Sequence, residues 1–224
     1  MRPAAATAVL GMALAVGVPA TWSLTRPPAS AGASVEQVLP APAPPSVGRE
    51  AAEAAEGPGA LPEVTARPAA PAGQVQRPAP VRLSVPALGV DTAVDAVGVE
   101  PDGQMTIPAE VDRVGWYRFG PAPGDDGSAV LAGHVDDREQ GLGAMAPLRT
   151  AEVGAEVVVT DAAGTTSRWR VVSREVISKQ VLPLDRLFAR DGPPRLTLIT
   201  CGGPFLPEFG SYRDNVVVVA EPVA

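Results

Sequence analysis

Three residues of this chain have the types that thiol catalysis requires. Cys201 is the only cysteine among the 224 residues, and His134 is the only histidine. Arg213 follows the cysteine after a short loop. A thiolate is the nucleophilic form of cysteine, an imidazole exchanges protons near neutral pH, and a guanidinium stays charged and donates several hydrogen bonds. We therefore expect Cys201 to act as nucleophile, His134 as acid and base, and Arg213 as a clamp for the oxyanion and the substrate.

Two predicted strands carry the cysteine and the arginine. Residues 195–201 alternate with a period of two, as in a half-buried strand, and the glycines and proline that follow are expected to end it. Residues 215–220 are mostly valine and predict the next strand, with Arg213 at its entrance. If the two strands pair antiparallel, Cys201 and Arg213 face each other across the loop. Arg195 is the rival cation, but it stands about 20 Å away, at the far end of the cysteine's strand.

The histidine also ends a predicted strand, which covers residues 128–134. Two residues that occur once each, both at strand ends, favour catalysis. Each also has a structural alternative, because free cysteine is among the most buried residue types and a lone histidine is often a core residue with one hydrogen bond. These alternatives stay open at the level of the residues alone.

An uncharged run precedes all of this. It covers residues 3–25 between Arg2 and Arg26, and about 20 apolar residues suffice to cross a bilayer as a helix. We expect residues 1–26 to be a signal-anchor that spans the cell membrane once, with the rest of the chain outside. The alternative is a cleavable signal peptide, with small residues at 18–20 or 29–31 as its processing site.

Residues 27–80 are rich in alanine and proline and contain no aromatic residue. Such a segment cannot bury enough apolar surface to offset the entropy of ordering, so we expect a disordered linker. The remaining residues, 81–224, are long enough for one globular domain. Because an exported chain with one cysteine cannot form an internal disulfide, its free thiol requires a chemical or intermolecular explanation.

Charge and motifs exclude several function classes. The formal net charge is -7, and it lies in residues 81–224 because the acidic and basic residues before them balance. An acidic domain argues against nucleic acid as a partner. The sequence contains no glycine-rich phosphate loop, zinc-ligand spacing or calcium-loop signature, so we expect neither a cofactor nor a metal.

Short strands at regular spacing dominate the domain, with a short helix expected over 181–189. This pattern is typical of a closed or nearly closed β-barrel or a sandwich. The predicted strands cover residues 81–85, 90–99, 105–107, 128–134, 156–160, 168–173, 195–201 and 215–220.

Three segments resemble the motifs of sortases. Thr-Leu-Ile-Thr-Cys at 197–201 looks like the sortase Thr-Leu-x-Thr-Cys signature, Ala-Gly-His-Val-Asp at 132–136 is similar to the histidine segment, and Tyr-Arg at 212–213 to the essential arginine. The opening at 81–91 is most similar to the class F group, with class E second. The resemblance implies an all-β, eight-stranded sortase-type barrel over 81–224, with short helices in the connections.

The resemblance also implies a reaction. Cys201 would cleave a Leu-Pro-x-Thr-Gly-like sorting signal between Thr and Gly, form a thioacyl enzyme with the surface protein, and pass it to an amine of a peptidoglycan precursor. Ile199 and Thr200 match motif positions that border the substrate in the family. The implied partners are surface proteins with a C-terminal sorting signal, the precursor amine and the membrane.

Two other functions are compatible with the residues alone. An L,D-type transpeptidase is also an exported, β-rich cysteine enzyme, but that family places a second histidine shortly before its cysteine, and this chain has none. A tethered surface domain without catalysis would keep Cys201 in its core and bind a partner through its acidic face.

Overall fold

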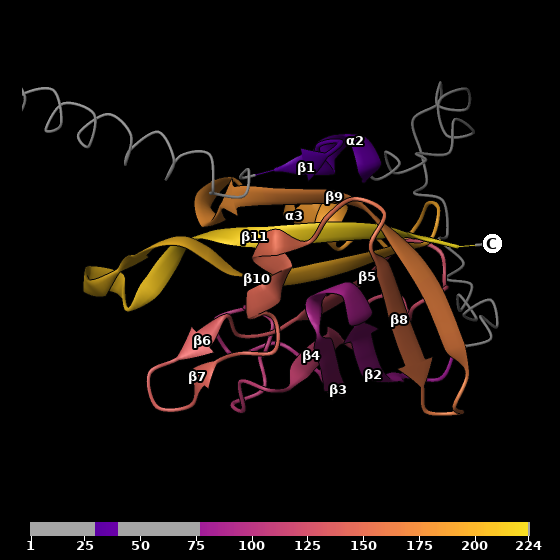
Figure 1. The fold of residues 1–224 in the computed structure, drawn as a ribbon, viewed down its shortest axis with the longest axis horizontal. Coiled ribbons are helices and arrows are strands. Elements are labelled where there is room, and N and C mark those ends of the chain that lie inside the picture. Colours follow the sequence, from indigo (N-terminus) through magenta and orange to yellow (C-terminus); the bar gives the residue numbers. More distant parts are fainter. Residues whose placement is uncertain (1–29, 40–76, 224) are drawn as a thin grey trace, which may run out of the picture.

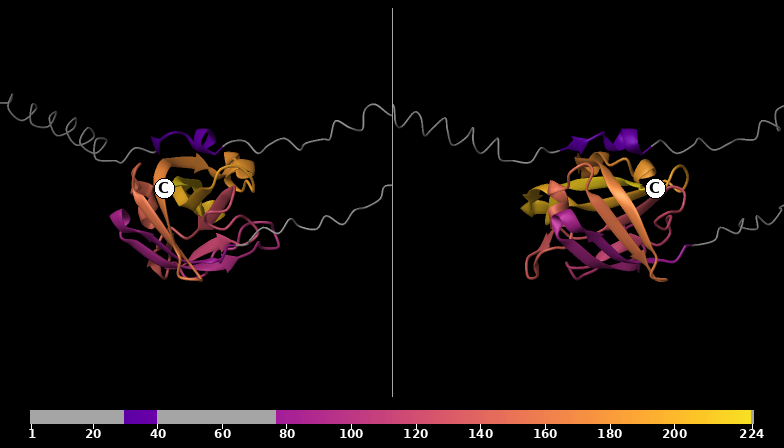
Figure 2. Two further views of the ribbon diagram at one scale, coloured as in Figure 1. Left: turned by 90° about the vertical axis from the view of Figure 1, so that its right-hand side faces the viewer. Right: turned by 45° about the vertical axis from the view of Figure 1, so that its right-hand side comes forward.

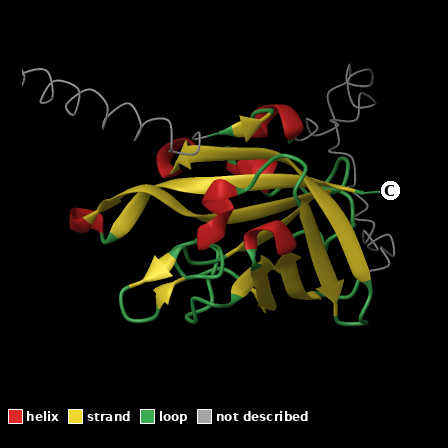
Figure 3. Ribbon diagram, viewed as in Figure 1, coloured by secondary structure: helices red, strands yellow, loops and turns green. Residues whose placement is uncertain are grey.

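The computed structural model describes residues 30–39 and 77–223, and within them strands dominate (Figures 1 and 3). Nine strands form one sheet in the order β1-β9-β11-β10-β5-β4-β3-β2-β8. The sheet closes because β8 also pairs with β9, so β2 to β5 and β8 to β11 make an eight-stranded barrel, as the resemblance implied. The strand predicted at 105–107 is wrong, since Met105 forms only an isolated bridge with Val99, and the barrel has β4 in its place. The strands of the barrel are β2 (Pro80–Val85), β3 (Val90–Val97), β4 (Val114–Tyr117), β5 (Ser128–Ala132), β8 (Glu156–Asp161), β9 (Thr166–Ser178), β10 (Arg195–Leu206) and β11 (Ser211–Pro222).

The helical elements are short and lie in the connections. A small hairpin, β6 (Asp136–Asp137) with β7 (Gly141–Leu142), stands apart from the barrel sheet. The helices described are α2 (Val35–Val38), α3 (Leu184–Leu187), η2 (Pro86–Leu88), η3 (Ala146–Thr150), η4 (Lys179–Val181) and η5 (Pro207–Phe209).

Alternation along the strands separates an inner face from an outer face. In β10, Leu196 and Leu198 lie in the main core, whereas Ile199 packs against a second apolar cluster. In β11, Val216 and Val218 lie in the main core, whereas Val217 and Val219, which alternate with them, belong to the second cluster. The valine run of β11 is therefore apolar on both faces because both faces are covered.

The second cluster lies outside the barrel and includes part of the predicted linker. Strand β1 (Ala31–Gly32) pairs antiparallel with β9, and α2 follows it across the outer surface (Figure 2). Val35 and Leu39 are buried there against β11 and α3. A capping box between Ser34 and Gln37 starts the helical turn.

The expectation of a disordered linker over 27–80 is therefore wrong for residues 30–39. The composition of the whole segment hid a local pattern: Val35, Val38 and Leu39 have the i, i+3, i+4 spacing of an apolar helix face. The other linker residues before 77, and the predicted membrane segment 1–26, lie outside the described residues. Within the ranges 30–39 and 77–223, no helix has the length and apolar character needed to cross a bilayer.

The predicted end of the cysteine's strand is also wrong. Strand β10 continues past Cys201 to Leu206, with an irregular register between Gly202 and Phe205. Gly203 has a φ of 71°, and a Cβ there would come within 2.1 Å of Asp214 Oδ2. The glycines therefore permit a bulge rather than a strand end, because only glycine tolerates this conformation beside a neighbouring side chain.

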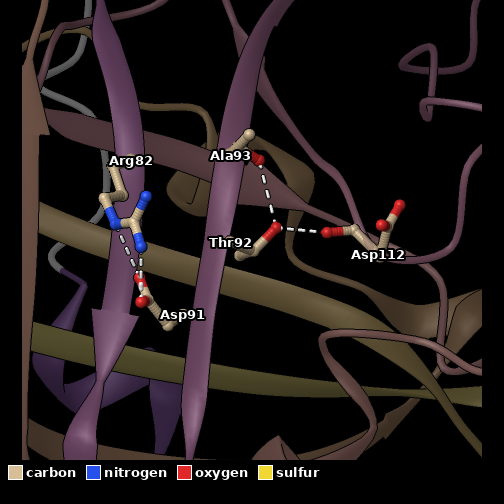
Figure 4. A network of polar contacts seen from close by, with 5 residues as sticks. All are labelled: Arg82, Asp91, Thr92, Ala93 and Asp112. Carbon is tan, nitrogen blue, oxygen red and sulfur yellow. Dashed lines mark hydrogen bonds and ion pairs between the residues drawn. The ribbon is translucent and has the colours of Figure 1, made fainter.

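Polar contacts secure the opposite wall of the barrel (Figure 4). Arg82 of β2 and Asp91 of β3 form a bidentate pair on the surface, with the Nε–Oδ1 contact at 2.7 Å. The buried Thr92 hydroxyl lies within hydrogen-bond distance of the carbonyl oxygens of Ala93, at 3.2 Å, and of Asp112. The contact between Thr92 and Asp112 joins β3 to the connection that leads into β4.

We expect Val35→Asp to destabilise the protein, because it places a carboxylate where the side chain is fully buried. The free energy of unfolding should fall by about 1–3 kcal/mol, which is the scale of losing one buried valine. Urea denaturation measures this, with Glu36→Ala on the exposed side of the same turn as the control. An unchanged midpoint for Val35→Asp would contradict the docking of residues 30–39.

Candidate active site

The register of two parallel strands places His134 beside Cys201. Strands β5 and β10 pair in parallel, with Ala132 opposite Ile199. The same offset continues beyond β5, since the Gly133 N–H donates to the Ile199 carbonyl at 3.1 Å and the Thr200 hydroxyl donates to the Gly133 carbonyl at 2.9 Å. One residue further along the same offset, His134 comes level with Cys201, and both residues line one pocket.

Both residues also belong to the outer face of the sheet. The inner positions of β5 and β10 are filled by core residues such as Leu131 and Leu198. Every second residue of a strand lies on the same face. Ala132 and Ile199 are on the outer face, so His134 and Cys201, two residues further on, are expected on that face too. The thiol, on β10, and the imidazole, just after the end of β5, therefore lie on the same side of the sheet.

A pocket of about 560 Å³ opens on this face. Cys201 and His134 are both half-buried and line it, together with Thr200 and Asn215. The half-buried position of Cys201 in a pocket excludes the reading in which it is only a core residue. The other lining residues are mostly apolar and come largely from two connections, with Val99, Met105 and Ile107 between β3 and β4, and Leu182, Leu184, Leu187 and Phe188 between β9 and β10.

The two predicted substrate-binding residues differ in their surroundings. Ile199 lines the pocket on the outer face, two residues before the cysteine on the same strand. Thr200 also lines the pocket, but its side chain is buried and its hydroxyl is bonded to the Gly133 carbonyl. Thr200 therefore holds the two strand ends together.

Arg213 lies near the cysteine along the sheet but outside the lining of the pocket. Asn215 of β11 is opposite Cys201, so Arg213 stands two residues further along β11. Its Nε and Nη2 each donate to the Asp214 carboxylate at 2.8 Å. The Arg213 side chain is 58% exposed, whereas that of Asp214 is 6% exposed. The hydrogen bonds from Arg213 lower the pKa of Asp214 below its ordinary value.

The rival cation has a structural role. The Arg195 guanidinium, at the other end of β10, contacts the carboxylate of Glu221 at 3.0 Å and donates to the carbonyl of Val38 at 3.2 Å. Arg195 therefore fastens the N-terminal segment and is not a residue of the pocket.

A hydrogen bond joins the histidine loop to β11. The Tyr212 hydroxyl donates to Asp136 Oδ2 at 2.5 Å, and the Tyr212 ring packs edge-on against Phe205 with ring centroids 5.3 Å apart. This hydrogen bond and the burial of the hydroxyl raise the pKa of Tyr212. Asp136 stands two residues after His134, so the bond fixes the histidine loop against the strand that carries Arg213.

The backbone after His134 is held from its other side. The Gly143 N–H donates to the Val135 carbonyl at 2.9 Å, and the Ala144 N–H donates to the Val111 carbonyl at 2.8 Å. A Cβ on Gly143 would come within 2.3 Å of the His134 carbonyl oxygen, so a residue with a side chain would displace the histidine backbone.

Sequence reasoning missed Lys179. Its Nζ lies 3.6 Å from Cys201 Sγ and 2.8 Å from the Ser211 hydroxyl oxygen, and it lines the pocket. The signal was present, because Lys179 is the only lysine of the chain, as Cys201 is the only cysteine. Within residues 30–39 and 77–223, no three acidic, histidine or cysteine side chains cluster in a way that could hold a metal ion.

Comparisons with known proteins agree on one family. A family model described as a sortase domain matches residues 83–223. Three solved structures of similar fold are the lid mutant of sortase A from Corynebacterium diphtheriae (19% identity, 66% of this chain and 72% of that chain, TM-score 0.51), sortase C-1 from Actinomyces oris (21%, 64% and 71%, 0.50) and sortase C1 from Streptococcus suis (16%, 65% and 74%, 0.50). At these identities the likeness shows the fold alone. No curated protein matches the chain.

We expect Arg213→Met to destabilise the protein at neutral pH, because it leaves the buried Asp214 carboxylate without its cation. Because the pKa of Asp214 is lower in the folded protein, the ionised carboxylate stabilises the wild type at any pH above the ordinary carboxyl pKa. This stabilisation is lost as the pH falls through the lowered pKa. Unfolding midpoints of wild type and variant should differ at pH 7 and converge once the pH has fallen below the lowered pKa of Asp214.

The double variant Arg213→Met/Asp214→Asn is the control for this measurement. It removes the unpaired charge and should recover part of the stability at pH 7. Equal midpoints for wild type and Arg213→Met at pH 7 would show that Arg213 does not stabilise Asp214.

Proposed function

From the premise that the chain belongs to the sortase family of cysteine transpeptidases, we propose that it cleaves a Leu-Pro-x-Thr-Gly-like sorting signal between Thr and Gly and joins the surface protein to a cell-wall amine. The family match decides against the L,D-type transpeptidase. The observation that supports the proposal most directly is the β5–β10 register, which makes Cys201 and His134 neighbours at one end of a mostly apolar pocket.

In the first half of the reaction, the Cys201 thiolate attacks the carbonyl carbon of the substrate threonine. A tetrahedral oxyanion forms, and the C–N bond to glycine then breaks as His134 gives its proton to the departing amine. The acyl group remains on Sγ as a thioester. In the second half, an amine of a peptidoglycan precursor attacks the thioester, His134 takes the proton from that amine, and the thiolate leaves.

Arg213 is proposed to stabilise the oxyanion. A guanidinium has five N–H donors, and Asp214 accepts from Nε and Nη2. Three N–H groups remain, two on Nη1 and one on Nη2, and Arg213 can direct these at the substrate without giving up either bond to Asp214. Asp214 would act as a positioning residue that holds the planar guanidinium in one orientation, as preorganised oxyanion stabilisation requires.

The wall of the pocket supports a substrate with apolar side chains at its start. Leu182, Leu187 and Phe188 form a continuous apolar surface with Ile199, next to the cysteine. The leucine and proline of a Leu-Pro-x-Thr-Gly peptide would pack against this surface, which places the threonine at the polar end. Ile199 is the predicted substrate-binding residue that best fits this role.

We further propose that residues 1–26 anchor the protein in the cell membrane with a single span and keep the catalytic domain outside. The uncharged run at 3–25 and the family's substrates, which lie outside the membrane, support this placement. Cleavage of the segment as a signal peptide is the alternative, and the N-terminal sequence of the mature protein decides between them.

The central test is cleavage of a Leu-Pro-x-Thr-Gly peptide by the purified full-length chain. Cys201→Ala and His134→Ala should each lower kcat/KM by roughly a thousandfold or more, and Arg213→Met by roughly a hundredfold. Arg82→Ala, on the opposite wall, is the control and should leave cleavage unchanged. Mass spectrometry should detect a peptide thioester on Cys201. Cleavage by Cys201→Ala at the wild-type rate would disprove the assignment.

The pH dependence of cleavage gives a separate prediction. The reaction requires an ionised thiol and a protonated imidazole at once, so kcat/KM should rise and then fall as pH increases. A fluorogenic peptide assayed from about pH 5 to pH 10 measures the profile, which should be bell-shaped. A rate that keeps climbing at the alkaline end would argue against His134 as the acid.

A further inference from the structure

The cation in contact with the sulfur is Lys179. Its Nζ lies 3.6 Å from Cys201 Sγ, within the range for a hydrogen bond to sulfur, and donates to the Ser211 hydroxyl at 2.8 Å. Arg213, the cation expected from the sequence, directs two of its nitrogen atoms at Asp214 instead. The two positive groups of the site therefore have different partners.

The strands explain how Lys179 reaches the sulfur. Ser178, the last residue of β9, pairs with Asp214 of β11, so Lys179 follows at the position next to Arg213. There the chain leaves the sheet and enters η4. The flexible lysine side chain extends from this point towards β10, and Ser211 at the start of β11 holds the ammonium group.

The composition of the chain gives an independent indication. Lysine and arginine together number 18, and reading the sequence shows that 17 of these are arginine. The only lysine contacts the only cysteine. An ammonium is a compact charge with three rotatable donors, whereas a guanidinium is a planar fork suited to a carboxylate. A lysine at this place can share its donors between a hydroxyl and a thiolate.

We propose that Lys179 is a second cationic residue of the active site, which stabilises the thiolate of Cys201 before the substrate binds and leaves Arg213 available for the oxyanion. The inference rests on Cys201 being the nucleophile, as proposed above. Ser211 is a positioning residue, since it holds the ammonium and does not contact the sulfur in any bond that the structure describes. When Sγ becomes part of the thioester, the Lys179 ammonium loses its charged partner and turns to Ser211 and solvent.

Two other charged groups in this part of the protein, Asp136 and Arg213, form hydrogen bonds with residues other than Cys201. The Asp136 carboxylate accepts from Tyr212, and Arg213 is paired with Asp214. Besides Lys179, the titratable groups that line the pocket with Cys201 are His134 and Tyr117. The titratable and charged groups on the segments packed around the thiol are thus His134 after β5, Lys179 after β9, Asp136 on β6, and Tyr212, Arg213 and Asp214 on β11.

Alkylation of the full-length protein by iodoacetamide tests the proposal without a substrate. Because Cys201 is the only thiol, the rate of modification reports on that thiolate alone. We expect Lys179→Met to slow alkylation about fivefold at pH 7 and to move the rise of the rate towards higher pH. Lys179→Arg should retain most of the rate, and Ser211→Ala should show a smaller loss than Lys179→Met.

Arg138→Met is the matched control, because it removes the same charge from the exposed turn between β6 and β7. It should alkylate at the wild-type rate, which would separate contact with the sulfur from a general change of net charge. Alkylation of Lys179→Met at the wild-type rate and with the wild-type pH profile would overturn the proposal. Slowing in Arg213→Met but not in Lys179→Met would assign the role to Arg213. Since no peptide is cleaved, either result is independent of the proposed substrate.

Discussion

The candidate active site depends on one pairing, between the parallel strands β5 and β10. The two strands are far apart in the sequence, yet they run side by side with a constant offset, so the residues that follow β5 come level with Thr200 and Cys201 of β10. The Thr200–Gly133 hydrogen bond continues this offset beyond the end of β5. A shift of one residue would send either the thiol or the imidazole to the inner face, because side chains alternate along a strand. The barrel core that fixes the register therefore also fixes the chemistry.

The site also depends on β11, whose two faces are both covered by apolar residues. The inner valines pack into the barrel, and the outer ones pack against residues 30–39 and α3. The same outer cluster includes Leu187, Phe188 and Ile199, which also line the pocket. Arg186 next to them donates to the carbonyl oxygens of Glu36 and Leu39, at 2.8 and 3.1 Å. The N-terminal segment thus supports the back of the pocket wall.

Much of the site could be predicted because it follows local rules. Alternation was enough to place Cys201 on a strand and His134 next to another, although the predicted strand end at Cys201 is wrong, and the short apolar strands were enough for an all-β barrel. The errors have a common origin in contacts between distant segments. The bulge at Gly203 exists because Asp214 lies against it, and the docking of Val35 depends on a surface that β11 and α3 build together. Lys179 reaches Cys201 across β11, and no spacing along the chain encodes that approach.

The pairing of β1 with β9 has a consequence for how the protein is handled. Arg174 and Ser173 of β9 have Ala31 and Gly32, respectively, as their strand partners on the outer side, and Ser173 donates to the Ala33 carbonyl at 2.6 Å. A recombinant version that begins at Arg77 would leave this edge without a neighbour and the outer valines of β11 uncovered. Unpaired edges next to apolar surface are where chains add to one another and precipitate. The ten residues at 30–39 belong with the folded domain, and boundaries chosen for expression or crystallisation have to include them.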